Sequence, residues 1–390
     1  PVAVISRGAL LSIVLSMGLA MSACAPEEAV VRVPEVDDSM VAGYRSDPAR
    51  SGEVSGSIGD RPVVAYRIDG DEPVIASPIL IGETGFVADG SGELVAFDVT
   101  TGEVFWRSSI GETDASIVAS TDSIFSVSAA GVVRRHDHGT GDIAWEADLE
   151  GATRSSPLLF DGALWVAVGD ELAVLDPSSG VRRDSIALEA QADSSPAASG
   201  AAIVIGTRSN RLAFVDVRSL AVELISVPDA SEEMRTYADG VAATPAIAGD
   251  SVYVGSTTGV LLSASLSGEI RWLVDVGSPI YGAVALGEGI GFVPTGSGLL
   301  IAFGLDDGEL RWSTELGDAA YSSPVLVGTV VLATAENGRL FAFEAESGEE
   351  LWSLEVGEPG NYMASTPAAL GQIVVLGSND GSIVGVDTDR

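Results

Sequence analysis

A tryptophan recurs about every 40 residues through most of this chain. Five of the six tryptophans share the spacing, with successive intervals of 39, 127, 40 and 40 residues: Trp106, Trp145, Trp272, Trp312 and Trp352. A glycine stands four positions before each of them, and the long interval is close to three periods. Repeats of this length indicate a fold in which one small supersecondary unit is stacked many times.

A Ser-Pro or Thr-Pro pair marks the same repeat and fills the long interval. The six pairs lie 79, 39, 49, 79 and 43 residues apart: Ser77-Pro78, Ser156-Pro157, Ser195-Pro196, Thr244-Pro245, Ser323-Pro324 and Thr366-Pro367. Together the two markers give eight repeats, which begin near residues 76, 115, 155, 194, 243, 281, 322 and 365. The third and fourth repeats lack the tryptophan, and we expect Asp184 and Leu224 to stand in its place.

The pattern within one repeat predicts four antiparallel strands. In the seventh repeat, four short apolar runs alternate with glycine-containing turns: residues 324–327, 330–333, 340–343 and 351–354. Short β-branched or aromatic runs between such turns are typical of antiparallel strands. Four strands per repeat, arranged around an axis, make a β-propeller blade. The sequence therefore predicts an all-β, eight-bladed propeller of four-stranded antiparallel blades.

The eighth repeat is short, because the chain reaches Arg390 after three predicted strands. A fourth strand is available in residues 61–69, where Tyr66 precedes Trp106 by 40 positions. We expect this N-terminal strand to complete the last blade, since closure of the ring removes open sheet edges. The propeller is thus predicted to span residues 61–390.

Residues 96–106 resemble the docking motif of pyrroloquinoline-quinone (PQQ) repeats, A-x-D-x-x-T-G-x-x-x-W. Residues 302–312 and 342–352 are close variants, with Gly304 and Glu344 at the aspartate position. The resemblance covers the predicted propeller and implies that fold. We expect the five repeated tryptophans and Tyr66 to be structural docking residues, with their rings buried between neighbouring blades. Because one fold serves many functions, the motif alone does not imply PQQ chemistry.

The first 24 residues have the composition of a bacterial lipoprotein signal. Arg7 precedes an apolar run over residues 8–21, and the Met-Ser-Ala-Cys sequence ending at Cys24 resembles a lipobox. These features predict a secretory signal peptide over residues 1–23. We expect Cys24, the only cysteine, to carry the lipid; the alternative is an incidental cysteine at an ordinary cleavage site. Residues 24–60, rich in Pro, Glu, Asp, Ser and Gly, are predicted to form a flexible tether.

The chain is strongly acidic, with a formal net charge of −36, and its basic residues are all arginine. Such a surface repels nucleic acid and anionic lipid headgroups, so we expect neither as a partner. Attachment to a membrane is predicted through the lipid anchor only.

The sequence shows no recognisable catalytic constellation. The resemblance raises the hypothesis of a PQQ-dependent dehydrogenase, but such enzymes hold a metal with acidic and amide side chains. Many also carry a vicinal disulfide, which a chain with one cysteine cannot form. His136 and His138 share a strand face and could bind zinc, but no third ligand is evident, and the alternative is a plain turn before Gly139. We expect no catalytic residue, no cofactor and no bound metal.

Two long connections between repeats are the candidate partner-binding loops, because binding residues gather on the loops of rigid scaffolds. They cover residues 228–240 and 358–363, with the candidate contact residues Met234, Arg235, Tyr237, Asn361, Tyr362 and Met363. Aromatic residues, methionine and arginine are enriched at protein interfaces. Both loops are expected on one face of the propeller; the alternative is variation in loop length without function.

Together these features predict a non-catalytic, extracytoplasmic, lipid-anchored scaffold that binds protein partners as a monomeric propeller. The combination resembles the outer-membrane β-barrel assembly factor B (BamB) family, lipoprotein propellers that bind the central barrel-insertion protein. The resemblance implies the periplasmic face of the outer membrane and a barrel-assembly partner. The arginine-only composition also suits actinobacteria, so the alternative is a cell-surface propeller that binds an unknown ligand. A PQQ-dependent dehydrogenase is the third hypothesis.

Overall fold

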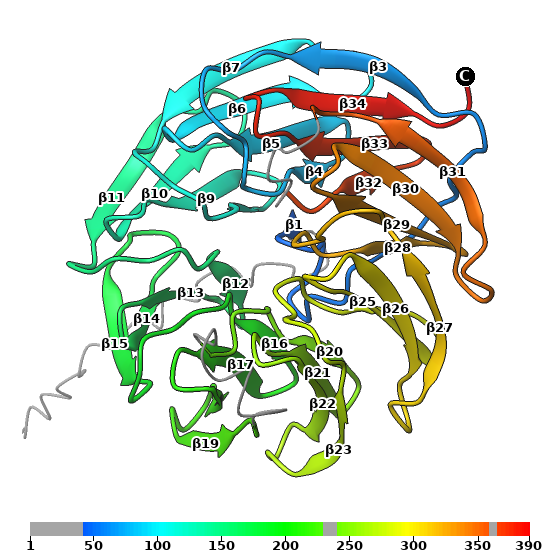
Figure 1. Cartoon of the computed structure of the whole chain (residues 1–390). Helices are drawn as coiled ribbons and strands as arrows, with labels where there is room; N and C mark the ends of the chain where they lie inside the picture. Colours follow the sequence, from blue (N-terminus) through cyan, green and yellow to red (C-terminus); the bar gives the residue numbers. More distant parts are fainter. Residues whose placement is uncertain (1–41, 229–239, 359–364) are drawn as a thin grey trace, which may run out of the picture. The chain divides into compact units, whose positions relative to one another are not determined.

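The computed structural model describes residues 42–228, 240–358 and 365–390, which form a ring of eight β-sheets (Figure 1). Each sheet contains one blade of four antiparallel strands, and two sheets gain a short extra strand from residues 42–54. This confirms the predicted fold class. Within the described ranges, no helix could cross a membrane.

Blades 1 to 4 follow one another along the chain, each running from its inner strand to its outer strand. Blade 1 contains β4 (Ile79–Ile81), β5 (Thr84–Ala88), β6 (Glu93–Asp98) and β7 (Val104–Ser109). Blade 2 contains β8 (Val118–Ala119), β9 (Ser123–Val127), β10 (Val132–Asp137) and β11 (Ile143–Asp148). Blade 3 contains β12 (Leu158–Phe160), β13 (Ala163–Val168), β14 (Glu171–Leu175) and β15 (Arg182–Ala187). Blade 4 contains β16 (Ala197–Ser199), β17 (Ala202–Thr207), β18 (Arg211–Asp216) and β19 (Val222–Ser226).

Blades 5 to 8 continue around the ring. Blade 5 contains β20 (Ala246–Ala248), β21 (Ser251–Gly255), β22 (Val260–Ser265) and β23 (Ile270–Asp275). Blade 6 contains β24 (Ala285–Leu286), β25 (Ile290–Pro294), β26 (Leu299–Gly304) and β27 (Leu310–Glu315). Blade 7 contains β28 (Val325–Val327), β29 (Val330–Ala335), β30 (Arg339–Glu344) and β31 (Glu350–Glu355). Blade 8 contains β32 (Ala368–Leu370), β33 (Ile373–Gly377), β34 (Ile383–Asp387) and, as its outer strand, β3 (Val63–Ile68).

The closing strand lies where the sequence predicts it. β3 pairs antiparallel with β34, from Val63 opposite Asp387 to Ile68 opposite Ile383. Figure 1 shows the blue N-terminal strand beside the red C-terminal one. The inner strands also begin three or four residues after the eight predicted repeat starts.

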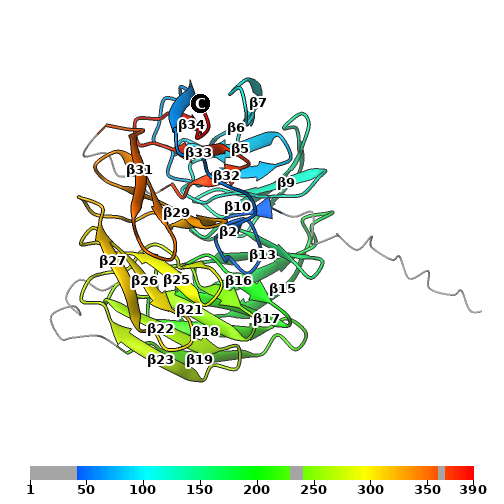
Figure 2. The same ribbon diagram turned by 90° about the vertical axis from the view of Figure 1, so that its right-hand side faces the viewer.

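The position of a strand in its blade determines its hydrophobic pattern. All residues of β13 are buried, because strands near the axis are covered on both faces by neighbouring blades. The outer strand β27 alternates instead, with Leu310 62% exposed and Trp312 half-buried. Figure 2 turns the ring by 90° and shows the outer strands β23, β27 and β31 along one edge.

The Ser-Pro and Thr-Pro pairs belong to a ring of hydrogen bonds around the central channel. The hydroxyl at this position accepts a hydrogen bond from the backbone N–H of the equivalent residue in the preceding blade. Seven bonds of 2.8–3.3 Å form the ring: Ser77 to Ser116, Ser116 to Ser156, Ser156 to Ser195, Ser195 to Thr244, Ala283 to Ser323, Ser323 to Thr366, and Thr366 to Ser77. Blade 6 has Ala283 at this position, which offers no hydroxyl to the N–H of Thr244.

Residues 42–54, which we call the channel segment, differ from the predicted tether. β1 (Ala42–Gly43) pairs with β8, and β2 (Glu53–Val54) pairs in parallel with β28. Between these strands, four carbonyls accept hydrogen bonds from the inner strands of blades 4 to 7: Pro48 from Ala198, Ala49 from Ile247, Ser51 from Leu286, and Gly52 from Leu326. The inner strands expose backbone groups towards the axis, and a polar segment can satisfy them there.

Two arginines fix the channel segment. Arg50 is fully buried and donates to the carbonyls of Pro157, at 3.0 Å, and Pro196, at 3.1 Å. Arg45, 4% exposed, donates to the carbonyls of Val284 and Ser51. Burial lowers the pKa of both guanidinium groups to about 10, so both stay charged at neutral pH.

Candidate functional site

The repeated tryptophans lie where neighbouring blades meet. Each indole N–H donates to a backbone carbonyl outside its own blade, at 2.8–3.2 Å: Trp106 to His138, Trp145 to Pro177, Trp272 to Leu305, Trp312 to Ala345 and Trp352 to Gly59. The Tyr66 hydroxyl does the same to the Val99 carbonyl, at 2.8 Å. We call this place on the outer strand the docking position.

A glycine of the next blade lies against the ring at five of these six positions: Tyr66, Trp106, Trp145, Trp272 and Trp312. Gly141 has φ of 74°, and a Cβ there would lie 2.5 Å from the ring of Trp106. Both the left-handed backbone and the close approach require glycine. The T-G and W of the motif are therefore the two halves of one contact between neighbouring blades, with the glycine of one blade facing the tryptophan of the blade before it.

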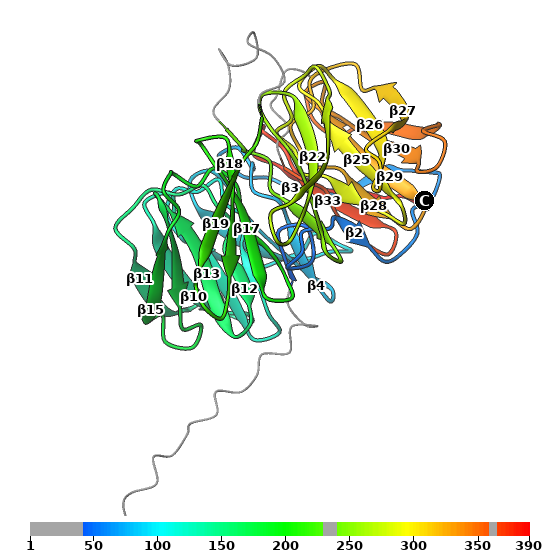
Figure 3. The same cartoon turned by 90° about the horizontal axis from the view of Figure 1, so that it is seen from below.

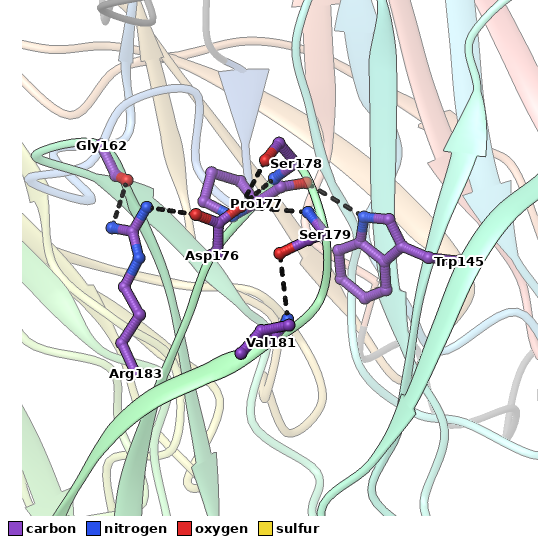
Figure 4. A network of polar contacts seen from close by, with 8 residues as sticks. All are labelled: Trp145, Gly162, Asp176, Pro177, Ser178, Ser179, Val181 and Arg183. Carbon is purple, nitrogen blue, oxygen red and sulfur yellow. Dashed lines mark hydrogen bonds and ion pairs between the residues drawn. The ribbon is translucent and has the colours of Figure 1, made fainter. Parts of the chain in front are cut away.

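The aspartate of the motif holds the turn on which the indole rests. In blade 3, Asp176 accepts hydrogen bonds from the N–H groups of Ser178, at 2.9 Å, and Ser179, at 3.0 Å (Figure 4). Arg183 pairs with the same carboxylate at 2.6 Å, and Trp145 donates to the Pro177 carbonyl beside it. Hydrogen bonds from Ser178 and Arg183 hold the pKa of Asp176 far below its usual range. This carboxylate is thus committed to a turn rather than poised for proton transfer.

The docking position of blade 3 holds Asp184, as the sequence predicts, because Asp184 pairs with Val174 just as Trp106 pairs with Ala96. The glycine that would face it in blade 4 is replaced by Leu220, whose φ is 58°.

Blade 4 corrects the prediction for Leu224. The other outer strands carry a bulge before the docking position, but β19 has none. Without the bulge the pairing moves by one residue, which turns each side chain to the opposite face of the sheet. Glu223 therefore stands at the docking position, opposite Phe214, and Leu224 packs towards blade 3.

The two histidines have structural surroundings. His136 is buried, with ring nitrogens 2.9 Å from Ser126 Oγ and 3.2 Å from the Gly141 carbonyl. Burial lowers its pKa, which favours the neutral form. The ring of His138 packs edge-on against Phe86. No group of three His, Cys, Asp or Glu side chains suited to a metal occurs in the described part of the chain.

The mouth of the central channel is a small polar cavity of about 160 Å³. Its lining includes Tyr44 of the channel segment and the charged side chains Asp114, Arg154 and Asp193. Arg154 pairs with Asp114 at 3.4 Å. This ion pair and the neighbouring serine hydroxyls can bind polar groups. The lining side chains do not place a nucleophile beside a base that would activate it.

The face that carries the connections between blades, the connection face, presents an aromatic pair. Tyr281 precedes the inner strand of blade 6 and Tyr321 that of blade 7, with ring centroids 5.3 Å apart. Tyr281 is 38% exposed. Burial, and then the Asp318 carboxylate, raise the pKa of Glu336 close by. This part of the face offers aromatic rings beside negative charge.

Seven of the predicted site residues lie outside the described residues: Cys24, Met234, Arg235, Tyr237, Asn361, Tyr362 and Met363. The loops that contain the last six connect blade 4 to blade 5 and blade 7 to blade 8. Tyr281 and Tyr321 belong to the two connections between them, which the sequence reasoning missed because each is short and has only one aromatic residue.

Comparison with the sequence profiles of protein families shows to which family the chain belongs. The profile of the family described as outer membrane protein assembly factor BamB matches residues 90–266 and 261–390. These two matches cover most of the propeller. The chain belongs to this family.

Two BamB proteins show how distant the relationship is. The outer membrane protein assembly factor BamB of Yersinia pestis is 25% identical over 223 residues, and that of Alteromonas naphthalenivorans is 26% identical over 231 residues. Each alignment covers 52% of this chain, and 56% and 55% of the respective relatives. The chain thus spans about half the length of the curated BamB relatives it matches.

Solved structures share the fold. BamB from Moraxella catarrhalis superposes with a TM-score of 0.67 at 16% identity, over 84% of this chain and 97% of that one. Quinohemoprotein alcohol dehydrogenase from Comamonas testosteroni gives 0.75 at 12% identity, over 92% and 82%. A europium-containing methanol dehydrogenase gives 0.74 at 11% identity, over 89% and 98%. At these identities the likeness shows the fold alone, so it does not separate BamB from the dehydrogenases.

The channel of this BamB-family chain does not fit a quinone cofactor. The channel segment occupies the axis of the ring, and the guanidinium group of Arg50 donates hydrogen bonds to backbone carbonyls there. A planar cofactor at the axis would have to displace Arg45, Arg50 and the backbone bonds of that segment.

Proposed function

We propose that this chain is a non-catalytic, lipid-anchored scaffold that binds a protein partner during the assembly of outer-membrane β-barrel proteins. Membership in the BamB family carries this proposal. The motif supports the non-catalytic part, because its aspartates and tryptophans hold turns and blade contacts. Cys24 is the proposed lipid attachment site, which would keep the propeller at the periplasmic face of the outer membrane.

The connection face is the proposed partner-binding surface. Tyr281 is exposed and forms an aromatic pair with the half-buried Tyr321, and such residues are enriched at the centres of interfaces. The neighbouring carboxylates of Asp318 and Glu336 favour a partner with arginine or lysine beside its apolar contact. The two predicted partner-binding loops connect the adjacent blades and would extend the same surface.

Affinity capture from native membranes tests the proposal. We expect the full chain to co-purify a barrel-assembly protein, and replacement of Tyr281 and Tyr321 together by alanine to reduce that yield without lowering the melting temperature. Replacement of Met234, Arg235 and Tyr237 together should do the same. Phe105→Ala, on the exposed rim of blade 1, is the matched control and should leave capture unchanged.

Two results would contradict this assignment. If both multiple variants captured as much barrel-assembly protein as the wild type, the connection face would not be the partner-binding surface. Capture without any barrel-assembly protein would favour a propeller that binds another ligand. Metabolic labelling with a fatty acid, in the wild type and in Cys24→Ser, tests the anchor. Titration with PQQ and calcium tests the non-catalytic assignment, and a saturable absorbance change would argue against it.

A further inference from the structure

The contact between blades 4 and 5 keeps two of the three parts of a docking position. Gly268 supplies the floor, with φ of 80°, as Gly141 does for Trp106. The carbonyl of Leu266 stands where Leu305 and Ala345 accept indole hydrogen bonds, because the N–H of Leu266 makes the same bond to the turn before it. The indole itself is missing, since Glu223 occupies the docking position.

The neighbouring contact between blades 3 and 4 lacks the same ring but is closed in another way. There the floor glycine is replaced by Leu220, which packs with Leu224 and Val222 at the edge of the core cluster between these blades. The two contacts therefore differ: one has lost both the ring and the floor, and the other has lost the ring alone.

An open groove of about 570 Å³ remains between blades 4 and 5. Phe214 and Leu266 provide apolar walls. Figure 3 views the ring from the side of these blades, with β18, β19 and β22 adjacent. Two side chains of β19 reach over the floor: Ile225 Cγ2 lies 3.1 Å, and the carboxyl carbon and one oxygen of Glu223 each lie 3.6 Å, from the position that a Cβ would take on Gly268.

The rim of the groove is acidic. Asp216, Glu223 and Asp250 line it. The charge of Asp250 is compensated by Arg271, which pairs with it at 2.7 Å. Hydrogen bonds from Ser219 hold the pKa of Asp216 below its usual range, which keeps this carboxylate charged. Glu223 and Asp216 thus add negative charge beside the apolar walls, in a chain whose net charge is already −36.

We propose that this groove binds the indole of a tryptophan in a partner protein, in a segment with arginine or lysine next to that tryptophan. The indole would rest on Gly268 and donate its N–H to the Leu266 carbonyl, as five tryptophans of this chain do with carbonyls at other blade contacts. The flanking cations would pair with Glu223 and Asp216. This site lies on the rim between two blades, is separate from the connection face, and does not depend on the proposed function.

Fluorine NMR with short peptides tests the site on the full chain. The probe is a trifluoroacetyl-capped Gly-Arg-Trp-Arg-Gly amide, and its line width is followed as protein is added. We expect saturable binding, with the Gly-Arg-Ala-Arg-Gly peptide and the Gly-Glu-Trp-Glu-Gly peptide each at least about tenfold weaker. Equal binding of the alanine peptide would overturn the indole site, equal binding of the glutamate peptide would overturn the cationic flank, and no binding at millimolar peptide would overturn both.

Two protein variants locate the binding. Glu223→Arg should weaken the tryptophan peptide by about tenfold or more. Asp184→Arg makes the same change at the docking position of blade 3, where Leu220 replaces the floor, and should leave binding unchanged. Glu223→Trp combined with Phe214→Ala should fill the groove from within and abolish binding. Equal losses in the first two variants would assign the effect to net charge and would remove the groove.

Discussion

At the scale of single residues, the glycine and the tryptophan of the repeat motif act across different blades. Trp145 lies against Gly180 of the next blade, so a larger side chain at that glycine can be accommodated only where the ring is replaced as well. The chain shows one such joint change, since Asp184 and Leu220 replace tryptophan and glycine at the same contact. Leucine at the glycine position would be poorly accommodated beside an intact tryptophan, because a leucine side chain and an indole cannot fill the same space.

Trp312→Ala measures how much one docking residue contributes to the free energy of unfolding. The indole is half-buried and loses both its packing and its hydrogen bond to Ala345, so we expect destabilisation of about 3 kcal/mol, the lower end for aromatic truncation. Urea unfolding followed by circular dichroism gives the value. Phe105→Ala, an exposed aromatic on the outer strand of blade 1, is the control and should cost far less. Equal costs would contradict the docking role.

The turn carboxylates predict how stability depends on pH. Hydrogen bonds hold the pKa of Asp176 below its ordinary value of 3.8, and the unfolded chain therefore binds this proton more readily. The stabilisation is present above that ordinary value and is lost as the pH falls towards the folded pKa. In Asp176→Asn, the urea midpoint should fall less steeply between about pH 4 and pH 2 than in the wild type. Val181→Ala, at an exposed side chain of the same blade that does not ionise, is the control and should keep the wild-type slope.

At the scale of elements, the strand pattern could be predicted from the sequence and the pairing of one strand could not. The tryptophan spacing and the Ser-Pro or Thr-Pro pairs located the eight inner strands to within four residues. The docking position of blade 4 was wrong by one residue, because a bulge depends on how two strands pair and leaves little trace in a single sequence. Only the strand pairing in the structure shows that Glu223, rather than Leu224, occupies the docking position.

The channel segment escaped prediction for a different reason. It has no hydrophobic period, and its composition matches that of a tether, yet its carbonyls and arginines satisfy backbone groups of strands more than 100 residues away. Composition predicts whether a segment can build its own core. It does not show that a finished ring offers unpaired strand edges to that segment.

Truncation measures the contribution of the channel segment. A chain of residues 42–390 should keep the stability of the full propeller, whereas residues 61–390 should melt at a lower temperature. The shorter chain loses Arg50 and the segment carbonyls that accept hydrogen bonds from blades 4 to 7, and it also loses the acceptor of Trp352 at Gly59. Differential scanning calorimetry compares the two. Identical melting temperatures would show that the segment is a passive occupant.

At the scale of the whole molecule, the hydroxyl ring links all eight blades but is incomplete at one place. Ala283→Ser would supply the missing acceptor for the Thr244 N–H. One additional buried hydrogen bond should stabilise the propeller by about 1 kcal/mol. Ser116→Ala, which removes an acceptor elsewhere in the ring, should destabilise it by a similar amount. Chemical denaturation of both variants checks the pair, and a loss of stability in Ala283→Ser would show that the site cannot hold the hydroxyl.

Ring closure also sets the order in which this protein can fold. β3 lies near the start of the chain and its partner β34 lies at the end, with Val63 opposite Asp387. Contacts this distant in sequence form late, because a long loop must close before they contribute. During synthesis, β3 must wait unpaired until the last residues have emerged. Until then the eighth blade has an exposed strand edge, which is the part of the unfinished propeller most prone to aggregation. A chaperone that shields this edge would act before the propeller closes.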